Sequence, residues 1–305
     1  MNILAYVPDF PPLRYTGAEL MLFDYLQALQ KKGHYVEVVM SREKRVVSEY
    51  AGIPIKDVTN WSDYDTIITH GGSMGEAFNR GIELKKTVIY LCHNTYRHAI
   101  RPEVKVIFNS QFTKNNTNID LNGNENIVCQ PIINFDYKRK KKRGKYITLI
   151  NCSESKGGKL FYEIAKEGNG LKFLAVKGWY GSQVEFNEKN IKQIEPVNHE
   201  NIYDVFKKTK ILLVPSAYEC WGRIGIEAMA SGIPVICSKG IGGLKEAYGN
   251  GAKYVNRENI NAWTKAIAEV ETDYEKWVEK GFARVNQLKK NINKSILNFE
   301  RLCKG

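Results

Sequence analysis

The 305-residue sequence has no apolar run near the ~18–20 residues that a membrane-spanning helix needs. Its six cysteines are scattered without any C-x-x-C spacing, which argues against a zinc site or a disulfide framework. Residues 1–7 read as an apolar strand and lack the basic start of a signal peptide. We therefore expect a cytoplasmic protein, with peripheral attachment to a membrane as an open alternative.

The sequence also lacks an Asp-x-Asp motif directly after a predicted strand, where it could bind a metal ion. Asp63-Tyr64-Asp65 has the spacing, but it comes before a predicted strand rather than after one. A solvated strand start explains these carboxylates better than a metal site does. We expect no metal-binding residues.

The excess of positive charge is concentrated in one part of the sequence. The composition is globular, with 43% hydrophobic and 26% charged residues, and the net charge is +12. Residues 1–137 carry a net charge of −1, whereas Lys138–Lys145 holds seven basic residues and no acidic one. Such a run can contact nucleic acid or an anionic membrane surface, or it can be a solvated connector. The neutral N-terminal half favours the connector.

Short apolar runs alternate with helical patterns along the whole chain, which is typical of doubly wound parallel sheets. The pattern predicts strands at 2–7, 35–40, 66–69, 88–92, 104–108, 146–150, 172–176, 191–196, 211–214 and 235–237. It predicts helices at 18–31, 159–167, 201–208, 225–230 and 259–303. The fold class is therefore α/β, with two Rossmann-like domains.

The stretch PSAYECWGRIGIEAMASGIPVIC, from Pro215 to Cys237, places two carboxylates at one sheet edge. Glu219 lies in the loop after a predicted strand, and Glu227 lies in what we expect to be the first turn of the next helix. Ligands bind at the carboxyl ends of strands in open α/β sheets. Ser231-Gly232 predicts a left-handed C-cap that ends this helix.

This stretch resembles the donor-site signature of retaining glycosyltransferases of family 4, which have the GT-B fold. The resemblance rests on Glu219-x7-Glu227 followed by AMASGIPVI, and it extends to elements along nearly the whole chain. It implies two Rossmann-like domains that face each other across a cleft, with a C-terminal helix crossing back to the first domain. The expected parts are an N-terminal acceptor-side domain (1–137), a basic linker (138–145), a donor domain (146–285) and the returning helix (286–305).

The resemblance also implies roles for individual residues. Glu219 would bind hydroxyls of the donor sugar, Glu227 the ribose, and Lys156 the diphosphate at a strand–loop–helix junction. Further donor or reaction-centre positions are Gly17 at the first helix start, His93 after the strand at 88–92, and the turn at Gly242 and Gly243. Glu219, His93 and Lys156 would be catalytic. His70 has the same strand-end position as His93, and we expect it to form a wall of the pocket.

One departure from the family pattern stands near Lys156. Many relatives carry an arginine a few residues before this lysine, whereas this chain has Asn151 and Cys152. Either phosphate binding is weaker, or another cation takes the place of the arginine. Arg223 is the first candidate and Lys177 the second.

The function that the resemblance implies is retaining, metal-independent transfer from a UDP- or GDP-sugar to a hydroxyl of a glycan, glycolipid or small molecule. No cofactor is implied beyond this nucleotide-sugar co-substrate. Two alternatives remain open: transfer to DNA that carries a modified base, suggested by the net charge of +12, and a non-catalytic nucleotide-binding protein.

Overall fold

Each half of the sequence folds around one parallel sheet. The computed structural model describes residues 1–42, 47–121, 123–133, 142–168 and 170–304. The chain divides into unit 1, which is Met1–Ile132 with Asn291–Gly305, and unit 2, which is Ile133–Lys290. The sequence analysis placed these divisions at 137/138 and 285/286. Of the expected linker at 138–145, residues 138–141 lie outside the described residues.

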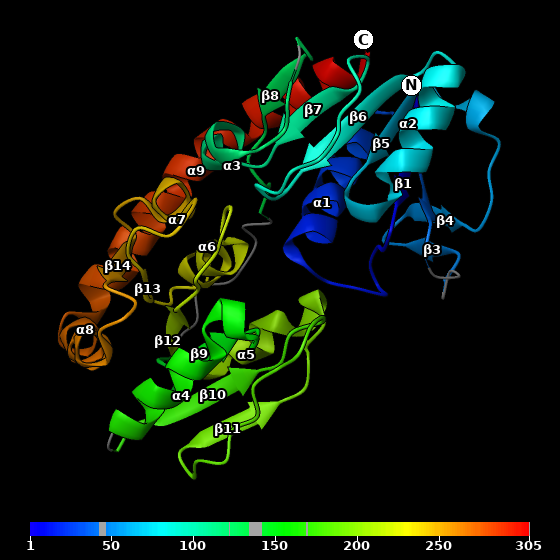
Figure 1. Cartoon of the computed structure of the whole chain (residues 1–305). Helices are drawn as coiled ribbons and strands as arrows, with labels where there is room; N and C mark the ends of the chain where they lie inside the picture. The colour runs from blue at the N-terminus through cyan, green and yellow to red at the C-terminus, as the bar shows by residue number, and fades with distance from the viewer. Residues whose placement is uncertain (43–46, 122, 134–141, 169, 305) are drawn as a thin grey trace. The chain divides into compact units, whose positions relative to one another are not determined.

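Unit 1 contains an eight-stranded sheet of order β3-β4-β2-β1-β5-β6-β7-β8 within the described residues (Figure 1). All neighbours in it pair in parallel except β3 with β4. Its strands are β1 (Asn2–Val7), β2 (Tyr35–Met40), β3 (Glu49–Tyr50), β4 (Ile53–Lys56), β5 (Thr66–Thr69), β6 (Thr87–Cys92), β7 (Lys105–Phe108) and β8 (Asn126–Val128). Its helical elements are α1 (Gly17–Lys31), η1 (Trp61–Asp63), η2 (Gly71–Ser73), α2 (Met74–Glu83) and α3 (Gln111–Asn116).

The sheet of unit 1 is covered on both faces by apolar side chains. On one face, residues of α1 share a core cluster with the last turns of the C-terminal helix, where Tyr25 and Phe299 stack at 4.3 Å between ring centroids. On the other face, α2 contributes Ala77 and Phe78 against β5 and β6. The topology changes direction between β1 and β5, so the loops after these two strands flank a switch point.

Unit 2 contains a six-stranded, all-parallel sheet of order β11-β10-β9-β12-β13-β14. The strands are β9 (Tyr146–Ile150), β10 (Lys172–Val176), β11 (Ile191–Ile194), β12 (Thr209–Val214), β13 (Val235–Ser238) and β14 (Ala252–Val255). The helical elements are η3 (Glu154–Lys156), α4 (Gly158–Glu167), η4 (His199–Asn201), α5 (Ile202–Lys208), α6 (Arg223–Ala230), α7 (Leu244–Tyr248) and α8 (Ile260–Thr272). Its switch point lies between β9 and β12, as in a Rossmann sheet.

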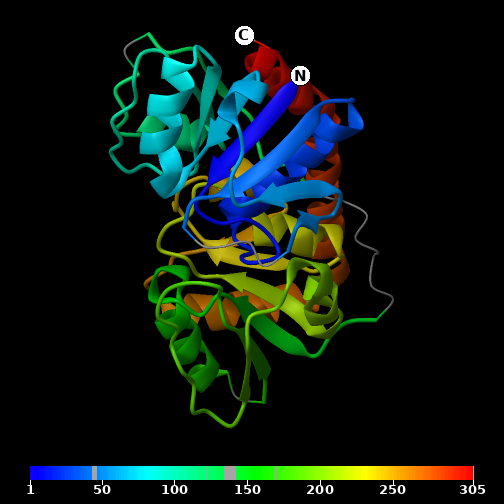
Figure 2. The ribbon, with the colours of Figure 1, turned by 90° about the vertical axis from the view of Figure 1, so that its right-hand side faces the viewer.

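The predicted helix at 259–303 is two helices, because α8 ends at Thr272 and α9 (Tyr274–Lys304) begins after Asp273. The apolar residues of this region divide between the cores of the two units. Trp277, Phe282 and Leu288 pack in the cores of unit 2, and Ile296 and Phe299 pack in the core of unit 1. Figure 2 shows α9, in orange to red, as one long helix. Among the described residues, no helix is both long and apolar enough to cross a membrane.

Candidate donor site and polar strand ends

The switch point of unit 2 brings together two of the loops that the sequence singled out. The loop after β9 leads through η3 into α4, and the loop after β12 leads into α6. Gly157 joins η3 to α4 with φ of 90°, a backbone conformation that favours glycine. A Cβ at Gly157 would collide with Pro215, so this glycine also allows the two loops to touch. Sequence and topology therefore agree on where a ligand of unit 2 would bind.

Lys156 and Glu219 form an ion pair at this point. The Nζ atom of Lys156 lies 2.7 Å from Oε1 of Glu219, and the hydroxyl of Ser216 donates to the same oxygen at 3.0 Å. Burial opposes the charge of Lys156, but the nearby carboxylate outweighs it and raises the pKa of the lysine. The structure thus holds a charged lysine beside a glutamate that is only 12% exposed.

Glu227 lies in α6 and is almost completely buried. The helix begins at Arg223, two residues before the predicted start, because Gly222 turns the chain in a left-handed conformation with φ of 82°. Glu227 is therefore in the second turn, and the expectation of a first-turn position is wrong. The Nε atom of Arg223 donates to Oε1 of Glu227 at 2.5 Å, and Nε2 of His199 lies 3.3 Å from the same oxygen.

These two partners explain why a buried carboxylate stays ionised. Burial alone would raise the pKa of Glu227, but Arg223 and then His199 lower it below its ordinary value. Arg223 itself is only 7% exposed. Arg223 pairs with Glu227 within this chain. Its role as a substitute for the missing arginine stays a prediction. The contact between His199 and Glu227 was not predicted from the sequence. His199 lies in η4, immediately before α5.

The turn at Gly242 and Gly243 packs directly against the loop that carries Glu219. Gly242 has φ of 46°, and the amide of Gly243 donates to the carbonyl of Glu219 at 2.9 Å. A Cβ at Gly243 would overlap the carbonyl of Cys220. Both glycines are therefore needed for the close approach of the two loops. The C-cap predicted after α6 is confirmed, since Gly232 has φ of 74°.

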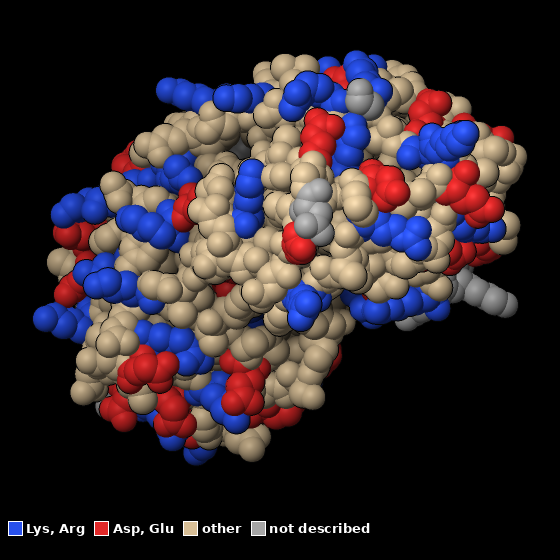
Figure 3. Space-filling model, turned by 45° about the horizontal axis from the view of Figure 1, so that its top comes forward, with Lys and Arg blue, Asp and Glu red and all other residues tan. Residues whose placement is uncertain are grey.

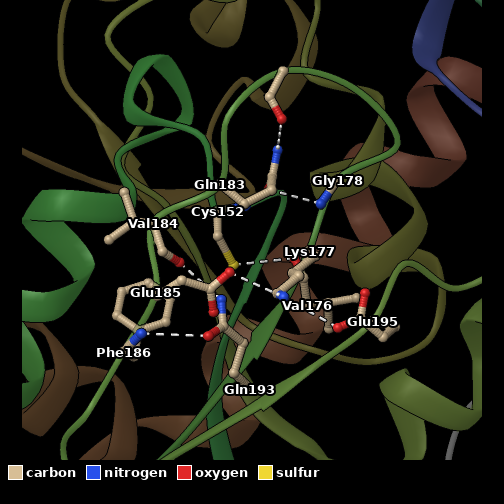
Figure 4. A network of polar contacts seen from close by, with 11 residues as sticks. Cys152, Val176, Lys177, Gly178, Gln183, Val184, Glu185, Phe186, Gln193 and Glu195 are labelled. Atoms are coloured by element: carbon tan, nitrogen blue, oxygen red, sulfur yellow. Dashed lines mark hydrogen bonds and ion pairs between the residues drawn. The ribbon is translucent and has the colours of Figure 1, made fainter.

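At the strand end after β9, where the sequence departs from the expected family pattern, this chain builds a neutral turn around Gln183 (Figure 4). Asn151 adopts a left-handed conformation with φ of 72°, and its Oδ1 accepts from the amide of Ser153 at 3.0 Å. The Oε1 atom of Gln183 accepts from the amides of Cys152 at 2.9 Å and Gly178 at 2.8 Å. An uncharged side chain from a distant loop therefore holds this strand end.

Lys177, the second candidate for the missing cation, is already paired with two carboxylates. Its Nζ lies 3.0 Å from Glu185 and 3.1 Å from Glu195, as Figure 4 shows. These hydrogen bonds raise its pKa. Lys177 and Arg223 are therefore both paired within the chain, and the choice between them as the substitute cation stays a prediction.

In unit 1, Gly17 is the first residue of α1, as predicted. It lacks a positive φ, and a Cβ placed on it would meet no atom of the chain within 4 Å. Neither turn geometry nor packing within the described residues requires glycine here. Close approach of a ligand to the backbone at the helix N-terminus is therefore a better reason for this residue than a tight turn.

His93 and His70 lie at the ends of β6 and β5 and contact each other edge to face. Their ring centroids are 5.4 Å apart with an interplanar angle of 88°. Burial lowers the pKa of His70 to about 4, and burial together with the neighbouring His70 lowers that of His93 to about 3. Both rings are therefore neutral at pH 7, a state in which imidazole can accept or donate a hydrogen bond.

The comparisons with known proteins address the unit that holds Lys156 and Glu219. Residues 182–284 match the family model described as "Glycosyl transferases group 1". The chain has the GT-B fold, and this part of unit 2 is similar to group 1 glycosyltransferases. The resemblance to group 1 glycosyltransferases and the predicted fold class, with two Rossmann-like units and a long C-terminal helix, are confirmed.

Curated relatives match this chain over a part of their length. D-inositol 3-phosphate glycosyltransferase of Corynebacterium glutamicum is 33% identical over 96 residues, which is 31% of this chain and 23% of the relative. O-antigen chain mannosyltransferase RfbU of Salmonella typhimurium is 37% identical over 78 residues, which is 26% of this chain and 22% of the relative. The matched part of the chain thus spans less than a quarter of these relatives.

Solved structures resemble the whole chain in fold. HepE of Anabaena, in complex with UDP-glucose, aligns with a TM-score of 0.80 and 16% identity over 99% of both chains. Sucrose-phosphate synthase of Thermosynechococcus elongatus aligns with a TM-score of 0.76 and 15% identity, covering 100% of this chain and 98% of the other.

Proposed function

We propose that this protein is a retaining glycosyltransferase that moves a sugar from a UDP- or GDP-sugar to a hydroxyl of a glycan, glycolipid or small-molecule acceptor. The Lys156–Glu219 pair carries this proposal, because it places a cation and a carboxylate together at the switch point of unit 2. A carboxylate accepts hydrogen bonds from sugar hydroxyls, and an ammonium stabilises a phosphate. Relatives named as glycosyltransferases and a fold neighbour bound to UDP-glucose support the same reading.

The chemistry would proceed by stabilising charge on the leaving group. In our proposal the Lys156 ammonium exchanges part of its contact with Glu219 for the donor diphosphate, and Glu219 then binds hydroxyls of the donor sugar. Glu227, held in place by Arg223 and His199, would accept from the ribose. Negative charge on the departing phosphate would be met by Lys156 and by the amides at the start of α4, whose first residue is Gly158.

Retention follows if the acceptor hydroxyl enters on the leaving-group face. Its proton would pass to the departing phosphate as the glycosidic bond breaks and an oxocarbenium-like transition state forms. His93 would contact the reacting sugar with a neutral imidazole. The proposed mechanism needs no metal, because Lys156 and helix amides stabilise the leaving group.

The charge distribution bears on the acceptor. On the face drawn in Figure 3, Lys and Arg side chains are interspersed with Asp and Glu. Within the described end of the basic run, Arg143 pairs with Glu275 at 3.0 Å and lies over the ring of Tyr274. Since a DNA-binding surface needs free cations for phosphate contacts, we rank a hydroxylated small molecule or glycan above DNA.

Incubation with UDP- and GDP-sugars tests the proposal. We expect one nucleotide sugar to raise the melting temperature and to be hydrolysed slowly by the full chain, with the sugar released first as the anomer of the donor in NMR spectra. Activity should persist in EDTA. Lys156→Ala should reduce turnover strongly, whereas Lys159→Ala, whose lysine is 70% exposed and pairs with Glu154, should not. A chain that binds a nucleotide sugar but never cleaves it would be the non-catalytic alternative.

A further inference from the structure

Gln183 connects the loops that follow β9 and β10 in unit 2. Its Oε1 atom accepts from the backbone amides of Cys152, at 2.9 Å, and of Gly178, at 2.8 Å, while Nε2 donates to the carbonyl of Tyr180 at 2.9 Å. The strands β9 and β10 are parallel neighbours in the sheet. One carboxamide therefore joins two adjacent strand ends (Figure 4).

The backbone of the same two segments is paired as well. The amide of Val184 donates to the carbonyl of Cys152 at 3.0 Å, and Ser153 forms an isolated antiparallel bridge with Gln183. A Cβ on Gly158 would collide with the carbonyl of Cys152, so the start of α4 packs closely on this residue. The position of Cys152 is thus fixed at its amide, at its carbonyl and by the helix start.

Lys156 lies in the short helical turn η3, directly after this anchored segment, and is its last residue. The amides of Lys156 and Gly158 both donate to the carbonyl of Ser153, at 3.1 Å and 3.0 Å. Because Ser153 follows Cys152 in the chain, a shift of Cys152 moves the carbonyl that closes the turn. The direction of the Lys156 side chain towards Glu219 therefore depends on a hydrogen bond from the loop after β10.

The hydrogen bonds of Gln183 also restrict how it can act on a donor phosphate. Its Oε1 atom already occupies two loop amides, and its Nε2 atom already donates to the carbonyls of Tyr180 and Gly181. The side chain is neutral, so it supplies no charge that would stabilise a phosphate. Any effect of Gln183 on a leaving group therefore has to pass through the side chains that it positions, and Lys156 is the cation among them.

We propose that Gln183 is a positioning residue of the donor site, which holds the turn η3 so that the Lys156 ammonium faces the departing phosphate. This role rests on the proposed function, in which Lys156 stabilises the leaving group. Loss of the carboxamide should slow the reaction more than it weakens binding of the donor, since Glu227 keeps its contacts with Arg223 and His199.

Gln183→Met tests this role, because methionine is similar in size and forms no comparable hydrogen bonds. We expect kcat to fall about tenfold and the donor KM to stay within about threefold, as for the loss of one good hydrogen bond felt in the transition state. In a Lys156→Ala background the same substitution should have no further effect, because the two residues act as one unit. Gln193→Met is the matched control. Its carboxamide bonds the same loop at Val184 and Phe186 but neither amide that Gln183 holds, and kcat should stay within about twofold.

NMR of the full chain without donor separates this role from the proposed function. The nitrogen shift of the Lys156 Nζ atom, assigned by its absence in Lys156→Ala, should change in Gln183→Met and not in Gln193→Met. Amide exchange of Cys152 and Gly178 should become faster in Gln183→Met alone. A wild-type chain that turns over no donor would defeat the proposed function, and the lysine signal would still decide whether Gln183 positions Lys156.

The role of Gln183 is overturned if the lysine signal is the same in wild type and Gln183→Met. It is also overturned if Gln183→Met lowers kcat by the same factor with and without Lys156, since a general loosening of the loop would act in both backgrounds. Should circular dichroism show that Gln183→Met does not fold, Gln183→Asn takes its place with the same expected changes, because its shorter side chain cannot reach both amides.

Discussion

The two units use the same kind of sheet but treat the polar groups at its switch point in opposite ways. In unit 2 the charged groups are paired within the chain, Lys156 with Glu219 and Glu227 with Arg223 and His199. In unit 1 the corresponding edge holds two neutral imidazoles and a carboxylate oxygen without partners among the described residues. The strand order therefore determines where a binding site lies in each unit, but it does not determine how the charges of that site are paired.

This difference suggests different tasks for the two edges. Paired charges keep their positions before a ligand arrives, which suits the stabilisation of a charged leaving group. Unpaired polar atoms can be satisfied by a ligand that offers them hydrogen bonds.

Arg223→Ala should lower the free energy of unfolding by about 3–5 kcal/mol, because it leaves the buried Glu227 carboxylate without its closest cation. Urea denaturation followed by the fluorescence of the tryptophans of unit 2 measures the loss. The double variant Arg223→Ala/Glu227→Gln should recover much of the stability, since the buried charge is then gone.

The same pair of variants separates folding from donor binding. If Arg223 contacts the diphosphate, the double variant should fold well and bind the nucleotide sugar more weakly than Glu227→Gln alone, which removes only the proposed ribose contact. Near-normal donor affinity in a folded Arg223 variant would eliminate this residue as the substitute for the missing arginine. Wild-type stability in Arg223→Ala would show that the pair with Glu227 is not what keeps unit 2 folded.

Lys156→Ala should reduce donor turnover about 10²–10³-fold, the typical effect of losing one group that stabilises developing charge. Initial rates of nucleotide release measure this loss, with Lys159→Ala as the control on the same segment. A similar loss in both variants would point to a general effect on η3 and α4 rather than to a specific role of Lys156.

Unit 1 should lose stability as the pH falls below about 6.5, whereas unit 2 should be less sensitive over the same range. His70 has a pKa of about 4 in the folded chain and an ordinary value near 6.5 when unfolded, so the unfolded chain binds more protons between these values. The stability contributed by its neutral form is complete above 6.5 and is lost towards pH 4, by about 2 kcal/mol at pH 5. His93 acts in the same direction.

Hydrogen exchange of β5 and β6 at pH 7 and pH 5 follows this effect within unit 1, and the strands of unit 2 serve as the internal reference. His70→Phe should flatten the pH dependence, because the phenyl ring does not titrate. An unchanged pH dependence in this variant would mean that other groups cause the acid sensitivity.

Glu300→Gln should have the smallest effect, about 0.5–1 kcal/mol, because partly exposed ion pairs contribute little each. Glu300 pairs with Lys32, His34 and Lys304, and these hydrogen bonds lower its pKa to about 2. Faster amide exchange at the end of α9 measures the loss. Glu275→Gln, which removes a partner of the exposed Arg143, should leave exchange in that segment unchanged.

Most of the fold could be predicted because its signals are local. Buried parallel strands appear as short apolar runs, and β1, β2, β5, β9 and β10 have the predicted bounds. The start of α6 was misplaced because the left-handed Gly222 acts through backbone geometry rather than through periodicity. Short elements such as β3 and β8 carry two or three residues each, too few to form a pattern.

The candidate site was predicted less completely, because its partners come from distant segments. The resemblance brought Lys156 and Glu219 into one site, and the structure places them in contact. No sequence pattern predicted that His199 would contact Glu227, or that Gln183 would accept a hydrogen bond from the amide of Cys152. Likewise, Asp9 and His70 are ordinary loop residues until the sheet brings β1 beside β5.

The division of α9 between the units bears on how this protein could be recombined with its relatives. Unit 1 includes residues 291–305, and Phe299, Leu302 and Cys303 belong to the same core cluster as the strands near the N-terminus. A chimera that joins residues 1–132 of this chain to the second half of a relative would therefore give unit 1 a foreign final helix. A fusion with two junctions, exchanging only residues 133–290, keeps each core intact and offers the cleaner way to transplant donor preference.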